Sequence, residues 1–321
     1  MNKIILNANY LVINALTAIK NKKYVEAKNL LEKAVSIQPE MFEANHNLAI
    51  LNLQLGNLDS SILYFEKSIK IKPKLPQVYF NLGLAYDKKK NIDLAIINFK
   101  KVIKLDPNHS IAFYNIGHLY KKKLDSIKAE EYLKKSLDLN PNFIKTYDDL
   151  FSLYDQSNQI NKFSNLLDKA KKILNEKELV SFYEAVFTYN QKNFKQTVKI
   201  LENLDLKENY VPHNITKHSL LAKSYDRINE FEKAYNHFKI NNQLVNESYG
   251  KDVDEKSFIQ LVTKRIEFFK NFKLNRWKQH QSKDEFLQPI FLVGFPRSGT
   301  TLLDTILRTN NSIEVIEEKP I

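Results

Sequence analysis

Residues 76–109 read PQVYFNLGLAYDKKKNIDLAIINFKKVIKLDPNH, and this stretch decides how most of the chain folds. Within it, Leu82-Gly83-Leu84-Ala85-Tyr86 is followed by Ala95, Phe99 and Pro107. Prolines stand at 39, 73, 107 and 141, a fixed step of 34 residues. A period of this length indicates an array in which each unit is one supersecondary element.

Small residues keep the same step at two places in each unit, and a large apolar residue keeps it at a third. The small residues are Ala15, Ala49, Gly83 and Gly117, then Ala27, Ser61, Ala95 and Ala129, and the large ones are Leu31, Phe65, Phe99 and Leu133. Small residues let two helices approach closely, and the large residue fills the gap between units. Proline ends each second helix because it cannot continue one. The pattern predicts helix pairs at 8–41, 42–75, 76–109 and 110–143.

The step continues more faintly towards residue 248. Its later members are Phe151, Phe163 and Leu167, then Ala185, Thr197 and Leu201, and finally Ala222, Tyr225, Ala234 and Phe238. The last set is displaced by three residues, which predicts a small insertion between Asp205 and Thr216. The L-G-x-x-Y, A-x-x-x-F and P pattern resembles the tetratricopeptide repeat. The resemblance implies a right-handed solenoid of about seven units over 8–248, with a polypeptide bound on its concave face.

Asparagines at the same place in three units suggest how such a polypeptide would be held. Asn47, Asn81 and Asn115 share the 34-residue step, and Asp149 continues the row. Side-chain amides can pair with the N–H and C=O groups of an extended chain. The row is similar to the asparagine ladder of O-linked N-acetylglucosamine transferase, which implies a peptide clamp. The alternative is that asparagine is simply a frequent occupant of this position in such repeats.

A second motif lies near residue 300. The apolar run from Ile290 to Val293 predicts a buried strand, and a turn with Gly294 and Gly299 leads into an apolar-periodic helix. Strand, glycine-bearing loop and helix N-terminus together form a cradle for a phosphate. The glycine spacing is that of the Walker A loop of nucleoside triphosphatases, but Thr300 stands at the position where that loop has a lysine. Arg297 is the only positive charge in the loop, which favours metal-free transfer of an anionic group.

Pro296-Arg297-Ser298-Gly299-Thr300-Thr301-Leu302 after a short apolar strand resembles the 5′-phosphosulfate loop of sulfotransferases, particularly the tyrosylprotein type and its repeat-bearing bacterial relatives. The resemblance implies that Arg297, Ser298, Gly299, Thr300 and Thr301 bind the donor, 3′-phosphoadenosine 5′-phosphosulfate, and that Arg297 stabilises charge on the bridging oxygen. It also implies that Glu318, at the end of a second strand, is the catalytic base. Glu317 is the substitute if the register slips, and a solvated charge cluster is the alternative for both.

The expected fold is therefore mainly α: a tetratricopeptide-repeat solenoid, a helical connector over 249–287, and the incomplete beginning of an α/β P-loop sulfotransferase domain over 288–321. Only 28 residues follow Val293, whereas a parallel sheet needs several strand–helix units. We therefore expect a fragment or a truncated gene, and no turnover by this chain alone. The region that would hold the 3′-phosphate of the donor has no counterpart in the sequence.

Composition restricts the remaining classes. The chain has 321 residues and no cysteine, and the absence of cysteine excludes thiolate chemistry. Its net charge of +12 suggests an acidic partner. No apolar run reaches the ~20 residues that span a bilayer, and no signal-peptide pattern occurs, so we expect a cytoplasmic protein without membrane contact. The seven histidines show no ligand spacing, and no nucleic-acid module is recognisable. We predict neither a metal site nor nucleic-acid binding.

The leading functional hypothesis is a sulfotransferase that transfers sulfonate to a hydroxyl, with protein tyrosine presented by the repeats as the expected acceptor. Carbohydrates and small metabolites are alternative acceptors. One alternative is a non-catalytic, peptide-binding scaffold in which the sulfotransferase segment is a vestige. Another is a phosphotransferase with an atypical loop, which the missing lysine argues against.

Overall fold

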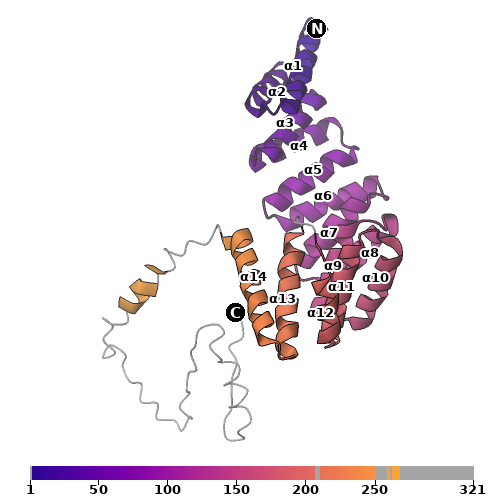
Figure 1. Cartoon of the computed structure of the whole chain (residues 1–321). Coiled ribbons are helices and arrows are strands. Elements are labelled where there is room, and N and C mark those ends of the chain that lie inside the picture. Colours follow the sequence, from indigo (N-terminus) through magenta and orange to yellow (C-terminus); the bar gives the residue numbers. More distant parts are fainter. Residues whose placement is uncertain (1, 207–209, 251–258, 261, 268–321) are drawn as a thin grey trace, which may run out of the picture. The chain divides into compact units, whose positions relative to one another are not determined.

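The computed structural model describes residues 2–206, 210–250, 259–260 and 262–267. These residues form helices joined by short turns, and no strand occurs among them (Figure 1). The first eight helices are α1 (Asn2–Lys20), α2 (Tyr24–Ile37), α3 (Phe42–Gln54), α4 (Leu58–Ile71), α5 (Pro76–Lys88), α6 (Ile92–Leu105), α7 (Ser110–Lys122) and α8 (Ser126–Leu139). They are followed by α9 (Ile144–Gln156), α10 (Ile160–Ile173), α11 (Lys177–Asn190), α12 (Phe194–Glu202), α13 (Val211–Arg227) and α14 (Phe231–Tyr249).

The helices α1 to α14 pack in sequence order, each against the next, within the unit Met1–Asp252 (Figure 1). Successive pairs correspond to the predicted repeats, and the mainly α, solenoid-like architecture is confirmed. The buried side chains form several consecutive clusters along the stack instead of one central core. This is expected of a repeat array, in which each unit contacts mainly its neighbours.

Close helix crossings explain the recurring small residues. A Cβ atom on Gly83 would lie 2.8 Å from Cε1 of Phe99, and one on Gly117 would lie 2.7 Å from Cγ of Leu133. Ser61 stands where the other three of the first four units have alanine, and its buried hydroxyl donates to the carbonyl of Ala49 at 2.9 Å. The large residues at the third repeating position are fully buried, as predicted: Leu31, Phe65, Phe99 and Leu133.

The turn inside each helix pair contains one residue in the left-handed region. These residues are Lys22, Gly56, Lys90, Leu124, Asn158 and Lys192, which again follow the 34-residue step, and then Asn229. The last one lies three residues beyond the step, in agreement with the predicted displacement of the final repeat. Only one of the seven is glycine, so residue type alone does not mark these turns.

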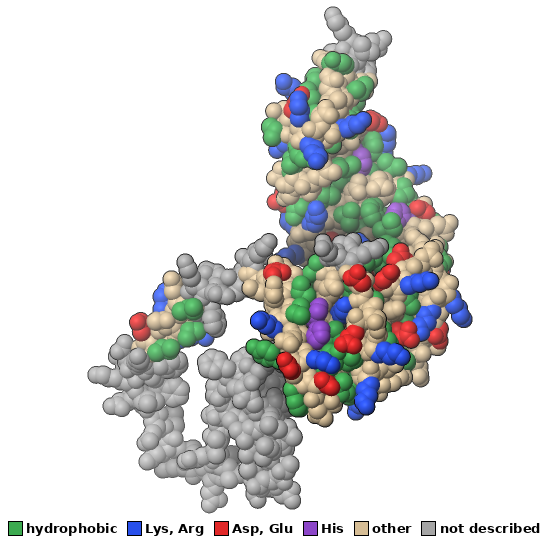
Figure 2. Space-filling model, in the orientation of Figure 1, with side chains coloured by type: hydrophobic (Ala, Val, Ile, Leu, Met, Phe, Trp, Pro, Cys, Tyr) green, Lys and Arg blue, Asp and Glu red, His purple; other side chains and the backbone are tan. Residues whose placement is uncertain are grey.

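The predicted connector and the predicted sulfotransferase segment lie outside the described residues, apart from helical residues at 259–260 and 262–267. None of the helices in the described part is both long and apolar enough to cross a bilayer. On the face shown in Figure 2, basic and acidic side chains are interspersed over the helices of the stack.

Candidate functional site

The first helices of the pairs are α1, α3, α5, α7, α9, α11 and α13. Among them α3 contacts α5, α7 contacts α9 and α11 contacts α13, and we call the surface formed by the first helices the A-helix face. The predicted asparagine ladder lies on three of them, with Asn47 on α3, Asn81 on α5 and Asn115 on α7. All three side chains are half-buried. Because each helix is a copy of the same unit, the three amides occupy equivalent places on consecutive helices.

The ladder amides retain hydrogen-bonding capacity. Nδ2 of Asn47 donates to the carbonyl of Glu43 at 2.8 Å, which leaves its Oδ1 without a partner among the described residues. Oδ1 of Asn81 accepts from Nε2 of Gln77 at 3.2 Å, and Nδ2 of Asn81 has no hydrogen-bond partner among the described residues. The side chain of Asn115 makes no hydrogen bond within the described part of the chain. Because the three side chains are only half-buried, their remaining amide atoms can bond to water or to a ligand. A fully buried amide without partners would instead destabilise the fold.

A hollow of about 440 Å³ opens between α3 and α5 on the A-helix face. Its apolar lining is Ile50, Leu53 and Leu84, and its polar lining includes Asn81 and Gln77. Gln54, Asp87 and Lys88 complete the rim. The hollow therefore places one ladder amide beside an apolar surface large enough to receive a side chain.

The fourth position of the row differs from the first three. Asp149 is buried, with Nδ1 of His118 at 2.7 Å from Oδ2 and Nζ of Lys121 at 2.7 Å from Oδ1. Burial by itself raises the pKa of Asp149, but hydrogen bonds from His118 and Lys121 and the lysine charge outweigh it, so the pKa lies below its ordinary value. The carboxylate is fully engaged within the protein. Asp149 therefore does not extend the ladder, and the row of available groups ends at Asn115.

Later polar groups of the A-helix face are likewise bonded to one another. The Tyr183 hydroxyl, one step beyond Asp149, donates to Oδ1 of Asp148 and lies 3.2 Å from Nε2 of His213. Burial raises the pKa of Tyr183 well above its ordinary value, and the neighbouring carboxylate of Asp148 raises it further. The A-helix face thus carries amides with free hydrogen-bonding atoms on α3 to α7, whereas Asp149 and Tyr183, at the next two positions of the row, are bonded to other side chains of the protein.

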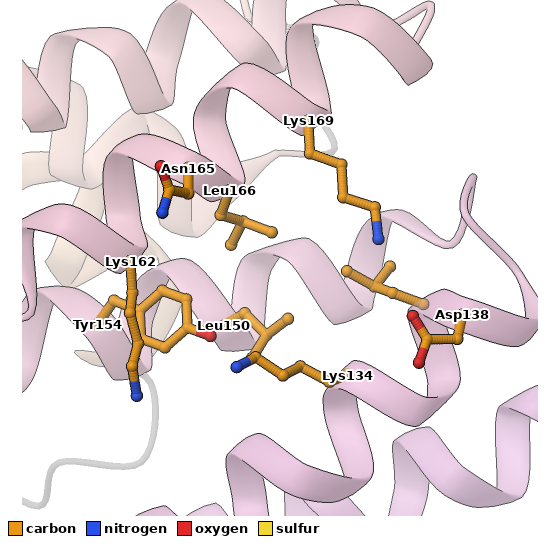
Figure 3. A pocket seen from close by; sticks show the side chains of 9 residues that line it. Lys134, Asp138, Leu150, Tyr154, Lys162, Asn165, Leu166 and Lys169 are labelled. Carbon is orange, nitrogen blue, oxygen red and sulfur yellow. The ribbon is translucent and has the colours of Figure 1, made fainter.

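A second hollow, of about 330 Å³, is lined by residues of α8, α9 and α10 (Figure 3). Leu137, Leu150 and Leu166 line it, and Lys134, Lys162 and Lys169 surround it. Two of these lysines are already paired, because Glu130 binds Nζ of Lys134 at 2.6 Å and Nζ of Lys162 at 2.7 Å. None of the predicted binding residues contributes to this hollow.

The crossing of α9 and α10 differs in sequence from the crossings of the first four helix pairs. At the crossing of α9 and α10, Phe151 and Phe163 take the places that small residues hold in the first four repeats. Their rings are in contact at a centroid distance of 4.7 Å.

The residues of the predicted donor site, Arg297, Ser298, Gly299, Thr300 and Thr301, lie outside the described residues. The same holds for Glu318, the predicted base. Their roles stay predictions from sequence.

Comparisons with known proteins identify the repeats. Models of the tetratricopeptide repeat match residues 18–79, 76–109 and 111–143. This chain therefore contains tetratricopeptide repeats from residue 18 to residue 143, as predicted. An uncharacterized protein of Aquifex aeolicus is 29% identical over 161 residues, which cover 48% of this chain and 20% of that protein. The chain spans about a fifth of the length of this curated relative.

The chain is similar in structure to several solved repeat proteins. A tetratricopeptide repeat protein from Parabacteroides merdae is 14% identical with a TM-score of 0.57, over 80% of this chain and 98% of that one. The MamA protein is 19% identical with a TM-score of 0.49, over 54% of this chain and 94% of that one. PilF of Pseudomonas aeruginosa is 15% identical with a TM-score of 0.44, over 80% and 99%. At this level of identity the Parabacteroides structure shows the helical repeat fold and nothing further.

The sequence prediction omitted the residues that make a binding surface around the ladder. Ile50 and Leu84 each follow a ladder asparagine by three residues, and Gln77 precedes Asn81 by four. On a helix these spacings place the residues beside the amide, one turn away. Extending the 34-residue comparison from asparagines to their neighbours one turn away would have found them.

Proposed function

We propose that this chain is a polypeptide-binding scaffold that holds an extended segment of a partner along the A-helix face. The observation that carries the proposal is the set of three half-buried amides, Asn47, Asn81 and Asn115, at equivalent places on α3, α5 and α7. The absence of an internal partner for part of each amide, within the described residues, supports a ligand that supplies both donors and acceptors. A polypeptide backbone supplies both at every residue.

An amide side chain suits a backbone partner because it carries one acceptor and two donors in a plane, like the peptide group itself. The available atoms differ along the ladder: Oδ1 on Asn47 can accept, and Nδ2 on Asn81 can donate. An extended chain presents N–H and C=O groups alternately, so it can donate to Oδ1 of Asn47 and accept from Nδ2 of Asn81. Recognition of this kind reads chain conformation more than sequence.

Selection from a random peptide display library, followed by titration, tests the proposal. Loss of a hydrogen bond that leaves a partner group unsatisfied costs about 1–3 kcal/mol, so Asn81→Ala should raise the Kd of a selected peptide about tenfold or more. Asn98→Ala is the matched control. Asn98 is half-buried like the ladder residues and, like Asn47, donates to the carbonyl four residues earlier, that of Leu94, at 2.8 Å, but it lies on the second helix α6. Equal effects of the two substitutions would contradict the proposal.

A second candidate function rests on the sequence of residues 290–301. Here the proposal is that this segment begins a sulfotransferase domain and that the repeats present the acceptor to it. The unbroken match from Pro296 to Leu302 to a phosphosulfate loop supports it. In the reaction, the acceptor oxygen would form a bond to sulfur while the bridging O–S bond of the donor breaks. Glu318 would take the acceptor proton, and Arg297 would stabilise the charge on the departing oxygen.

Reading the source gene beyond codon 321 tests this second proposal. A continuing frame that encodes further strand–helix units, with an Arg and a Ser placed for a 3′-phosphate, would support it. In the longer product, Glu318→Gln should abolish turnover and spare binding of adenosine 3′,5′-bisphosphate. A stop codon directly after Ile321, or preference of the longer product for Mg-ATP, would overturn it.

A further inference from the structure

We propose that the hollow between α3 and α5 selects an apolar side chain of the bound polypeptide, and that Lys88 at its edge selects an acidic residue beside it. The inference rests on the proposed scaffold function and adds a sequence preference to it. It starts from the composition of the hollow, whose base is formed by Ile50, Leu53 and Leu84 next to the amide of Asn81. A chain held by Asn81 necessarily brings a neighbouring side chain to this apolar base.

The apolar lining belongs to a row that runs beside the ladder. Leu16, Ile50 and Leu84 follow the 34-residue step on α1, α3 and α5. Leu16 is 45% exposed and Ile50 and Leu84 are half-buried, so the row is accessible. The next member of the row is His118, which is bound to Asp149 at 2.7 Å. Apolar contacts are therefore offered on α1 to α5 and stop at α7.

A basic row lies on the other side of the apolar row, one helical turn further along each helix. Its members are Lys20, Gln54, Lys88 and Lys122, all exposed and again at the 34-residue step. Lys122 is paired with Asp87 at 3.1 Å, whereas Lys20 and Lys88 form no ion pair within the described part of the chain. The carboxylate of Asp87, which lines the hollow, is thus neutralised by Lys122, whereas the ammonium group of Lys88 at the rim has no such partner among the described residues. The charge complementary to this rim is negative.

The spacing of the helices sets the period of the preferred sequence. Packed helices lie about 8–10 Å apart, and an extended chain advances about 3.3 Å per residue. Because α3 contacts α5, equivalent contacts on these two first helices should recur about every third residue of the ligand. A polyproline-II chain also repeats its faces every three residues. The fitting ligand is an extended segment with an apolar and an acidic residue in each triplet.

Designed peptides test this directly by fluorescence anisotropy. Acetyl-(Gly-Leu-Asp)₄-amide should bind at least about tenfold more tightly than acetyl-(Gly-Gln-Asp)₄-amide, because burying a leucine contributes that much. It should also bind more tightly than acetyl-(Gly-Leu-Lys)₄-amide, with a difference that shrinks in high salt. These comparisons use the unaltered protein, so they do not depend on whether a variant folds. Equal affinity for the leucine and glutamine peptides would overturn the inference.

Variants locate the effect. Leu84→Gln should abolish the preference for leucine over glutamine, whereas Leu63→Gln, at a side chain 49% exposed on the second helix α4, should not. Lys88→Glu should reverse the preference between the aspartate and lysine peptides, and Lys101→Glu on α6 should leave it unchanged. If Asn81→Ala weakens every peptide while Leu84→Gln leaves the preference intact, the scaffold function stands and this inference fails. If no designed or library-selected peptide binds, both fail.

Discussion

Leu124 lies in the turn between α7 and α8 with a φ of 60°, and its side chain is 88% exposed. The left-handed conformation costs a leucine about 1–2 kcal/mol, and an exposed side chain recovers almost none of it by packing. Leu124→Gly removes that cost but adds about 0.5–1 kcal/mol of backbone entropy lost on folding. We therefore expect a net stabilisation of about 0.5–1 kcal/mol. For a helical unit of this size the melting temperature should rise by about 1–4 °C.

Urea and thermal unfolding followed by circular dichroism measure this difference. Leu124→Ala is the matched control, because alanine keeps the left-handed cost and loses only exposed atoms, so its stability should stay within about 0.5 kcal/mol of the parent. The reciprocal change is Gly56→Ala. Gly56 occupies the equivalent turn with a φ of 79°, and an added Cβ atom would meet nothing within 4 Å, so the variant should lose about 1 kcal/mol from the backbone alone. If Leu124→Gly is no more stable than Leu124→Ala, the reasoning is refuted.

Three further predictions concern packing and pH. Phe99→Ala should cost about 3–5 kcal/mol in urea unfolding because the ring is fully buried, whereas Ile97→Ala, 53% exposed on the same helix, should cost well under 1 kcal/mol; similar costs would contradict the packing account. The folded-state pKa of Asp149 is lowered, so its carboxylate contributes to the free energy of unfolding above the unfolded pKa of about 3.9, and this contribution is lost as pH falls through the folded pKa. Stability measured by urea unfolding should therefore decline below about pH 4, and Asp149→Asn should make that decline less steep. An identical pH profile for the variant would contradict this prediction. Burial, and secondarily the nearby His237 at 3.0 Å between Nδ1 atoms, lowers the pKa of His218 to about 4, so the unit should lose stability as pH falls from about 6.5 towards 4, and His218→Gln should remove part of this loss in thermal melts.

The repeated part of the fold follows from residues whose role is local. Proline at the helix ends and the small residues at the crossings predict where helices stop and approach, and the structure places Gly83 against Phe99 and Gly117 against Leu133 accordingly. The position of the asparagine ladder on consecutive first helices follows from the same period. These features are predictable because each depends on contacts within one unit or with its neighbour.

Other features depend on side chains that meet only after folding. Asp149 continues the ladder in sequence, yet His118 and Lys121 from the preceding repeat occupy its oxygens. Phe151 keeps the period in a fainter form, and its ring packs against that of Phe163 across the crossing of α9 and α10. Left-handed turns at Leu124 or Lys90 carry no residue signal, because the helix pairing imposes the conformation on whichever residue stands there.

Photocrosslinking of a bound peptide tests the central claim most directly. A photoreactive phenylalanine analogue would replace Gln54 or Gln77 beside the hollow between α3 and α5, and Lys101 on α6 as a control. The account predicts efficient crosslinks from the first two positions to a library-selected peptide, and their loss on addition of unlabelled peptide. Crosslinks that form equally from α6, or only from α6, would contradict binding on the A-helix face.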